Sequence, residues 1–206
     1  IMGFSNRMFY NNELVADITV KETVLQANEE SDLLSKPIDF IDTAGCGFDE
    51  KQNEETLSLY NVPEADIIWK HLNLLAEEYK NSGNDISKLS IGIIAPYKSQ
   101  IETLQDQFHD NVVSDELKKI ISIKTIDGFQ GEERDIIYIS FVRSNDKGEI
   151  GFLSDIRRTN VALTRARKKL VMIGDSATLA ANDFYKSLID YCEEQNCYRS
   201  AWEFSY

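Results

Sequence analysis

"FQGEERDIIYISFVRSN", residues Phe129–Asn145, places a polar loop with one glycine directly before the apolar run Asp135–Val142. A short apolar run bounded by polar residues is typical of a strand that is buried on both faces. Similar runs occur at Leu89–Pro96, Ile120–Ile126 and Lys169–Asp175, and helical patterns alternate with them. This alternation predicts an α/β fold of three layers, in which helices cover both faces of a mostly parallel sheet.

The remaining elements follow from capping residues and periodicity. A helix is predicted to begin at Asn61, with Asn61 as its N-cap, Pro63 in its first turn and Glu64 complementing the helix dipole, and to reach Tyr79. A short strand is predicted at 37–43 and a loop at 43–61, and residues 1–60 are expected to be partly loop-rich. Further helices are predicted at 98–110, at 155–167, and from a cap at Ser176 to about Glu194.

Length and composition limit the class of protein. The 206 residues suit one domain, and the chain begins with Ile, so we expect a fragment of a longer protein. No signal peptide is evident, and no apolar run approaches the roughly 20 residues that span a membrane. The odd number of cysteines, Cys46, Cys192 and Cys197, predicts reduced thiols in an intracellular protein, and no metal site is expected.

Charge is distributed unevenly along the sequence. The net charge of −13 argues against a protein that coats nucleic acid. Residues 157–174, however, contain six basic residues and no acidic residue, which predicts a local basic face. Loops at the carboxyl ends of the predicted strands, with Lys98 and Arg143, could together bind an anion. The residues alone therefore indicate a phosphate-binding α/β domain.

Three stretches also carry a family resemblance. "SIKTIDGFQGEERDIIYISFVRSN" (122–145) resembles motif V of superfamily 1 helicases, and "GFLSDIRRTNVALTRARKKLVMIGD" (151–175) resembles motif VI and its following strand. "IGIIAPYKSQ" (91–100) resembles the strand and PY-x-x-Q turn of the branch that contains the nonsense-decay RNA helicase, senataxin and the Okazaki-fragment nuclease-helicase. The resemblance runs from Phe4 to about Ala180 and implies the second, C-terminal RecA-like domain of the motor.

The resemblance also implies a divided nucleotide site. This sequence has no G-x-x-x-x-G-K-[ST] motif and no Walker B segment, so ATP with Mg²⁺ is expected to be bound mainly by a first RecA-like domain. Arg165 is implied to be the arginine finger, and Gln130, Gly131 and Glu133 to contact the nucleotide. Glu132 is expected to be a solvent-facing charge. Arg167, two residues further along the predicted helix, is expected to point away from the nucleotide and toward a structural partner.

A second set of residues is implied to contact single-stranded DNA or RNA. These contacts are expected to reach the nucleic-acid backbone, although Tyr97 and Asn160 could instead be structural. Ile156 and Thr159 depart from the family pattern, which often has Pro and Leu there, and they leave the choice between DNA and RNA open. The implied nucleic-acid residues are Pro96, Tyr97, Lys98, Thr125, Asp127 and Asn160.

The sequence thus predicts the C-terminal motor domain of an ATP-dependent DNA or RNA helicase, inactive by itself and paired with the N-terminal RecA-like domain of the same protein. One alternative is a non-catalytic nucleic-acid or protein-binding module on a helicase fold. The intact Gln130, Gly131, Glu133 and Arg165 argue against such decay. Another is a nucleotide-binding domain unrelated to helicases. A Walker A motif upstream of Ile1 would discriminate between these hypotheses.

Overall fold

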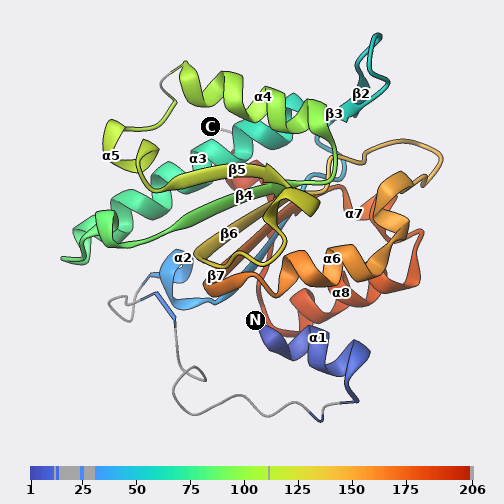
Figure 1. Ribbon diagram of the computed structural model, residues 1–206. Helices are drawn as coiled ribbons and strands as arrows, with labels where there is room; N and C mark the ends of the chain where they lie inside the picture. The colour runs from blue at the N-terminus through green and yellow to red at the C-terminus, as the bar shows by residue number, and fades with distance from the viewer. Residues whose placement is uncertain (12, 14–23, 26–30, 111, 205–206) are drawn as a thin grey trace.

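The computed structural model describes residues 1–11, 13, 24–25, 31–110 and 112–204. At its centre is a six-stranded sheet in the order β5-β4-β6-β7-β1-β8, and every neighbouring pair of strands is parallel (Figure 1). The predicted α/β class is therefore confirmed. The strands are β1 (Ile38–Asp42), β4 (Ile91–Ala95), β5 (Ile121–Thr125), β6 (Arg134–Ser140), β7 (Ala166–Gly174) and β8 (Tyr198–Ser200).

Helices cover both faces of this sheet and enclose two apolar cores (Figure 1). Successive β6 side chains alternate between the cores, with Tyr138 in one and Ile137 and Ile139 in the other. Among the described residues, no helix combines the length and the apolar character needed to cross a bilayer. One face carries α2 (Asp32–Ser35), α3 (Val62–Asn81), α4 (Lys98–His109) and α5 (Asp115–Lys118), and the other carries α1 (Met2–Phe9), α6 (Ile156–Leu163), α7 (Ser176–Leu179) and α8 (Asp183–Glu194). Short 3₁₀ helices lie at η1 (Ile86–Lys88), η2 (Asp127–Phe129), η3 (Gly151–Ser154) and η4 (Ala201–Phe204).

Some predicted elements were wrong. The predicted loop 43–61 contains a hairpin, β2 (Lys51–Gln52) with β3 (Leu59–Tyr60), which projects from the body (Figure 1). The predicted helix 155–167 ends at Leu163, because β7 begins at Ala166 and pairs with β6. The predicted last helix is divided into α7 and α8. Asp175 rather than Ser176 caps α7, and Asn182 caps α8.

The start of α3 confirms one prediction and overturns another. Asn61 is the N-cap, and its side-chain oxygen accepts a hydrogen bond of 3.1 Å from the Glu64 amide. Glu64, however, is fully buried, and its Oε2 accepts hydrogen bonds from Ser140 Oγ at 2.5 Å and from the Val142 amide at 2.9 Å. Burial, opposed by these hydrogen bonds, raises the pKa of Glu64 to about 8. At neutral pH this carboxyl is mostly protonated, so it does not complement the helix dipole.

A buried charged cluster joins β1, β7 and β8. Asp39 lies fully buried, 2.6 Å from Lys169 Nζ and 3.1 Å from Arg199 Nε. Burial raises the pKa of Asp39, but hydrogen bonding to His71 and the nearby Lys169 ammonium lower it by more. Lys169 therefore does not belong to the predicted basic face, because its charge is used inside the protein.

The protonated Glu64 predicts a specific pH dependence of stability. Between its ordinary pKa of 4.5 and its folded pKa of about 8, the folded chain holds a proton that the unfolded chain has lost. The Glu64 contribution is therefore complete below pH 4.5 and falls by up to about 1.4 kcal/mol per pH unit until the folded pKa is passed. Glu64→Gln removes this titration while keeping an acceptor for Ser140. Urea denaturation should show that wild type loses stability relative to Glu64→Gln as pH rises from about 5 to about 8.

Glu77→Gln is the matched control, because Glu77 is exposed on the same helix. Its stability should follow that of the wild type at every pH. A stability difference between wild type and Glu64→Gln that does not change with pH would contradict a protonated Glu64.

Candidate functional site

The connection between β5 and β6, residues 126–133, runs the length of the sheet, and we call it the crossing loop. It begins where β5 ends, at the carboxyl end of the sheet, and finishes where β6 begins, at the amino end. Since β4 lies between β5 and β6, the loop crosses β4 on the way. The loop was expected to lie at the carboxyl ends of the strands, together with the loops that contain Lys98 and Arg143. Because it reaches both ends of the sheet, that prediction is wrong. The predicted site residues form two groups, one at each end of the sheet.

A single aromatic side chain anchors the crossing loop to the sheet. Phe129 is only 1% exposed and packs directly over Gly92 of β4. A Cβ atom at residue 92 would lie 2.5 Å from Phe129 Cζ and 2.7 Å from Ile137 Cδ1, so only glycine leaves room for the ring. The Arg134 guanidinium lies 5.2 Å from the centre of the same ring. The glycine inside the apolar run "IGIIAP" is the sequence signal for such a close approach.

The group at the amino end contains the residues implied to contact the nucleotide. Gln130 and Gly131 are exposed, and Gly131 has a φ of +80°, which favours glycine. The backbone of Arg165 is joined to the loop's end, because the Arg134 amide donates a 3.1 Å hydrogen bond to the Arg165 carbonyl. Arg165 Nε donates to the Val161 carbonyl at 3.2 Å, and Arg165 makes no ion pair with any described residue.

The acidic residues at the end of the loop are both ion-paired, and for Glu132 this differs from its predicted role. Glu132 is not a free surface charge, because it lies 2.6 Å from Lys124 Nζ and 2.7 Å from Arg134 Nη2. The hydrogen bond from Lys124 lowers the pKa of Glu132. Glu133 is paired with Arg167 Nε at 3.2 Å. Arg167 lies on β7, so its predicted place on a helix is wrong, but in Glu133 it has the kind of structural partner that was predicted for it.

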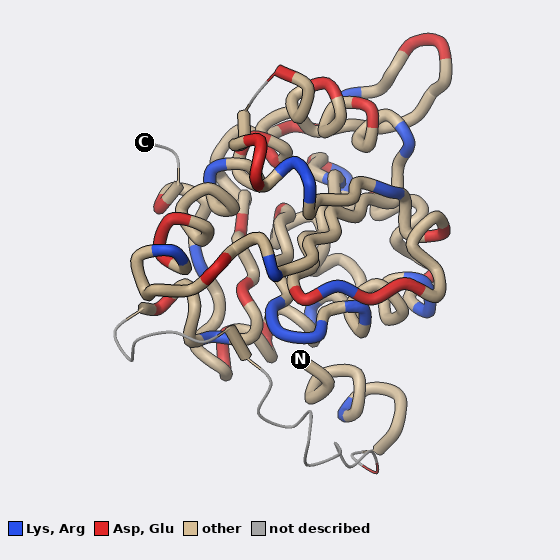
Figure 2. Tube along the Cα trace, turned by 60° about the vertical axis from the view of Figure 1, so that its left-hand side comes forward, with Lys and Arg blue, Asp and Glu red and all other residues tan. Residues whose placement is uncertain are grey.

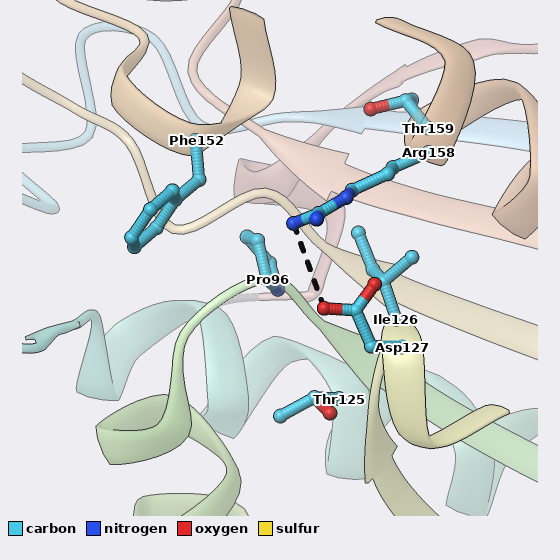
Figure 3. Close-up of a pocket in the computed structure, with 7 residues that line it drawn as sticks. All are labelled: Pro96, Thr125, Ile126, Asp127, Phe152, Arg158 and Thr159. Atoms are coloured by element: carbon cyan, nitrogen blue, oxygen red, sulfur yellow. Dashed lines mark ion pairs between the residues drawn. The ribbon is translucent and has the colours of Figure 1, made fainter. Parts of the chain in front are cut away.

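The group at the carboxyl end surrounds a small pocket of about 120 Å³ (Figure 3). Asp127 lies 3.5 Å from Arg158 Nη1, and Arg158 Nε lies 3.2 Å from Asp155. Thr125 Oγ1 accepts a hydrogen bond of 3.2 Å from the Gly128 amide. The pocket therefore combines predicted residues with Phe152, to which no role was assigned from the sequence, and with Arg158, which was predicted as part of the basic stretch 157–174. Its lining is Pro96, Thr125, Ile126, Asp127, Phe152, Arg158 and Thr159.

Tyr97 and Arg143 lie beneath this pocket rather than on its surface. Tyr97 is 4% exposed, and its hydroxyl accepts hydrogen bonds from Arg143 Nη1 at 3.4 Å and from the Phe152 amide at 3.3 Å. Arg143 is buried 2.9 Å from Glu50, so the prediction that it forms an open anion site is wrong. The Tyr97 ring supports the pocket from inside, and little of it is available to a ligand.

The two other residues implied to contact nucleic acid have different environments. Lys98 is exposed at the first turn of α4, with Nζ 3.6 Å from Glu102. Asn160 is half-buried on α6, and its Oδ1 is buried without a hydrogen-bond partner among the described residues. Lys98 is therefore accessible to a large ligand, whereas Asn160 lies deeper.

Most of the predicted basic face is balanced by acidic partners, and among the described residues only Arg157 and Arg165 of the six basic residues make no ion pair. Arg158 and Arg167 are paired with the crossing loop, and Lys168 lies 3.2 Å from Asp135. Figure 2 shows that basic and acidic segments are interspersed along the described part of the trace. The sequence does not reveal most of this balance, because Asp127, Glu133 and Asp135 are distant in the chain and only the Arg158–Asp155 pair is local.

Comparison with known proteins gives a consistent set of relatives. A family model described as an AAA domain matches residues 1–177. DNA polymerase alpha-associated DNA helicase A of Saccharomyces cerevisiae is 39% identical over 207 residues, which cover 94% of this chain and 29% of that protein. DNA-binding protein SMUBP-2 of Rattus norvegicus is 35% identical over 207 residues, covering 99% of this chain and 20% of that protein. Helicase sen1 of Schizosaccharomyces pombe is 41% identical over 142 residues, covering 68% of this chain and 8% of that protein. The chain thus spans less than a third of the length of these relatives.

The contact between Phe129 and Gly92 predicts a coupled pair of mutations. Gly92→Ala forces the ring outward and should lower the free energy of unfolding by about 1–3 kcal/mol. Phe129→Leu removes the ring atoms that clash, so the double variant should be more stable than the sum of the single losses predicts, by ~0.5–3 kcal/mol. Equilibrium denaturation of the four proteins measures this coupling. Strictly additive losses would show that the ring does not rest on Gly92.

Proposed function

Since this chain belongs to the AAA domain family matched above and, within it, to the superfamily 1 helicase branch that includes the Sen1 helicases, we propose that it is the C-terminal RecA-like motor domain of an ATP-dependent DNA or RNA helicase. One observation carries the proposal. Arg165 is without an ion pair among the described residues, and it lies at the amino end of the sheet beside the end of the crossing loop.

Arg165 is the proposed arginine finger. Three neighbouring arginines, Arg134, Arg158 and Arg167, are each paired with a carboxylate. Arg165 is held only through its Nε, so both terminal nitrogens are left to bind an anion. A planar guanidinium matches phosphate oxygens in a two-point contact and stabilises charge that develops during phosphoryl transfer. An arginine on the second domain reaches the phosphate only when the two domains close.

Gln130, Gly131 and Glu133 are proposed to contact the same nucleotide. A Cβ atom at Gly131 would meet no atom within 4 Å, so the loop has open space where its backbone could approach a ligand. No group of three or more His, Cys, Asp or Glu side chains in the described part of the chain could hold a metal ion. We therefore assign the binding of Mg²⁺, which neutralises charge on phosphate oxygens, to the first RecA-like domain, together with most ATP contacts.

The carboxyl end of the sheet is proposed to form one wall of the single-strand groove. Thr125 and Asp127 belong to this wall, with Pro96, Lys98 and Asn160, and Tyr97 contributes mainly through its backbone. The first RecA-like domain would supply the other wall. Because the crossing loop reaches both ends of the sheet, a nucleotide at one end and a strand at the other would act on one segment.

The finger assignment predicts a specific kinetic defect in the two-domain protein. Arg165→Lys keeps the positive charge but loses the planar fork, so kcat for ATP hydrolysis should fall by on the order of 10² or more. ATP binding should change much less, and single-strand binding without nucleotide should persist, because Arg165 lies at the other end of the sheet. Steady-state ATPase assays with saturating single strand, together with nucleotide titrations, measure these effects.

Arg7→Lys is the control, because Arg7 is an exposed arginine of α1 that is paired with Glu194. Its kcat should equal that of the wild type. An Arg165→Lys enzyme with near-normal kcat would refute the finger assignment, although the protein would still be an ATPase.

The 206-residue chain by itself is expected to hydrolyse no ATP above background, because its sequence contains no phosphate-cradling G-x-x-x-x-G-K-[ST] loop. Phosphate release by the purified chain at high protein concentration tests this expectation. Turnover that Arg165→Ala abolishes would show that the chain holds a complete site and would contradict a site divided between two domains.

A further inference from the structure

Phe152 is a large apolar side chain that the fold leaves in solvent. It is 66% exposed on η3, whereas the next residue, Leu153, is 1% exposed and packs in the core. The Phe152 ring contacts the Tyr97 ring, with centroids 5.3 Å apart, but most of its surface remains in solvent, so this contact alone does not explain its position.

The backbone beneath the ring is firmly held. The Phe152 amide donates to the Tyr97 hydroxyl at 3.3 Å, and this hydroxyl also accepts from Arg143. Gly151 has a φ of +53°, and a Cβ there would lie 2.5 Å from Arg143 Nη1 and 2.6 Å from Tyr97 Oη. This position admits only glycine without rearrangement. The ring is thus presented from a braced backbone rather than from a loose loop.

The pocket beside the Phe152 ring is large enough for one group of a longer ligand chain. In Figure 3 the Phe152 ring borders one side of the pocket, and Arg158 and Asp127 border the other. The cavity of about 120 Å³ is smaller than the roughly 300–1,000 Å³ that small-molecule sites occupy. It suits one group of a larger chain. An aromatic face next to a guanidinium fits a nucleobase followed by its phosphate.

The polar surroundings of Phe152 favour nucleic acid over a protein partner. Ser154, Asp155 and Arg157, which follow it along the chain, are exposed, as is Arg158. A protein interface usually centres on a contiguous apolar patch depleted of charge, and one ring among charges does not form such a patch.

We propose that Phe152 is a stacking platform for one base of the bound single strand, and that Arg158 meets the phosphate beside that base by exchanging its contact with Asp127. This inference rests on the proposed nucleic-acid function and adds to it a position along the strand at which a base, rather than backbone alone, is required. Stacking uses the π-face that every base has, so the contact is tolerant of sequence.

The test is a scan with abasic strands. The two-domain protein is titrated with single-stranded oligonucleotides that are identical except for one abasic residue, moved along the strand. A strand abasic at the stacked position should bind about 5- to 100-fold more weakly than the intact strand. Phe152→Ala should weaken binding of the intact strand by a similar factor and remove the dependence on that position. Phe152→Trp should restore both, because it keeps an aromatic face.

Trp202→Ala is the matched control. Trp202 is also an exposed aromatic residue, 52% exposed, but it lies on η4 after β8, the strand at one edge of the sheet, away from the pocket. Its abasic profile should equal that of the wild type.

Different failures separate the two proposals. If wild type binds the intact strand but Phe152→Ala keeps the same affinity and abasic profile, the stacking proposal is overturned and the nucleic-acid function stands. If Phe152→Ala changes only strand-stimulated ATP hydrolysis, the ring contacts the first RecA-like domain, and stacking is again overturned. If wild type binds no single strand even at low salt, the proposed function itself fails.

Discussion

The packing of Phe129 over Gly92 is the contact on which the arrangement of both candidate groups depends. Residues 126–133 cross β4 and contain only one short 3₁₀ helix, Asp127–Phe129. The loop therefore has little hydrophobic surface with which to pack against the sheet. Burying one ring against a strand that lacks a side chain at that point fixes its middle. With the middle fixed, Asp127 is held at the carboxyl end of the sheet and Glu133 at the amino end.

A buried ion pair between β1 and β7 also constrains β7, the strand to which the end of the crossing loop is joined. Asp39 and Lys169 are both fully buried, and the desolvation of such a pair offsets much of its attraction. Removing one partner would leave the other charge buried without compensation, which is strongly destabilising. Lys169 follows Arg167 and Lys168 on β7, so a strand that begins with two surface ion pairs continues into a buried one. This change from surface to interior fixes the register of β7, the strand that directly follows Arg165.

The sequence predicted the elements that depend on local chemistry. Strands β4 and β6 were found because burial on both faces makes them continuously apolar, and the start of α3 because Asn61 caps it, whereas the short polar strand β8 (Tyr198–Ser200) was missed. The β2–β3 hairpin was missed because it carries no apolar alternation. Residues 164–167 were assigned to a helix because their pairing with β6 is a tertiary effect that overrides local propensity. The ion pairs of Arg158 and Arg167 could not be predicted, because their partners Asp127 and Glu133 lie about thirty residues away in sequence.

Because most of the basic residues are paired with carboxylates, a phosphate that binds one of them must first displace its partner. A chain with a net charge of −13 cannot attract a polyanion through its overall field, and Arg158 and Arg167 already have carboxylate partners. Exposed pairs of this kind contribute about 0–1 kcal/mol, so a phosphate can displace either carboxylate at small cost. On the proposed function, a strand at Arg158 would release Asp127, and a nucleotide at Glu133 would release Arg167. Each ligand then breaks one ion pair of a loop that stays anchored at Phe129, and in this way both sites would act on the same segment.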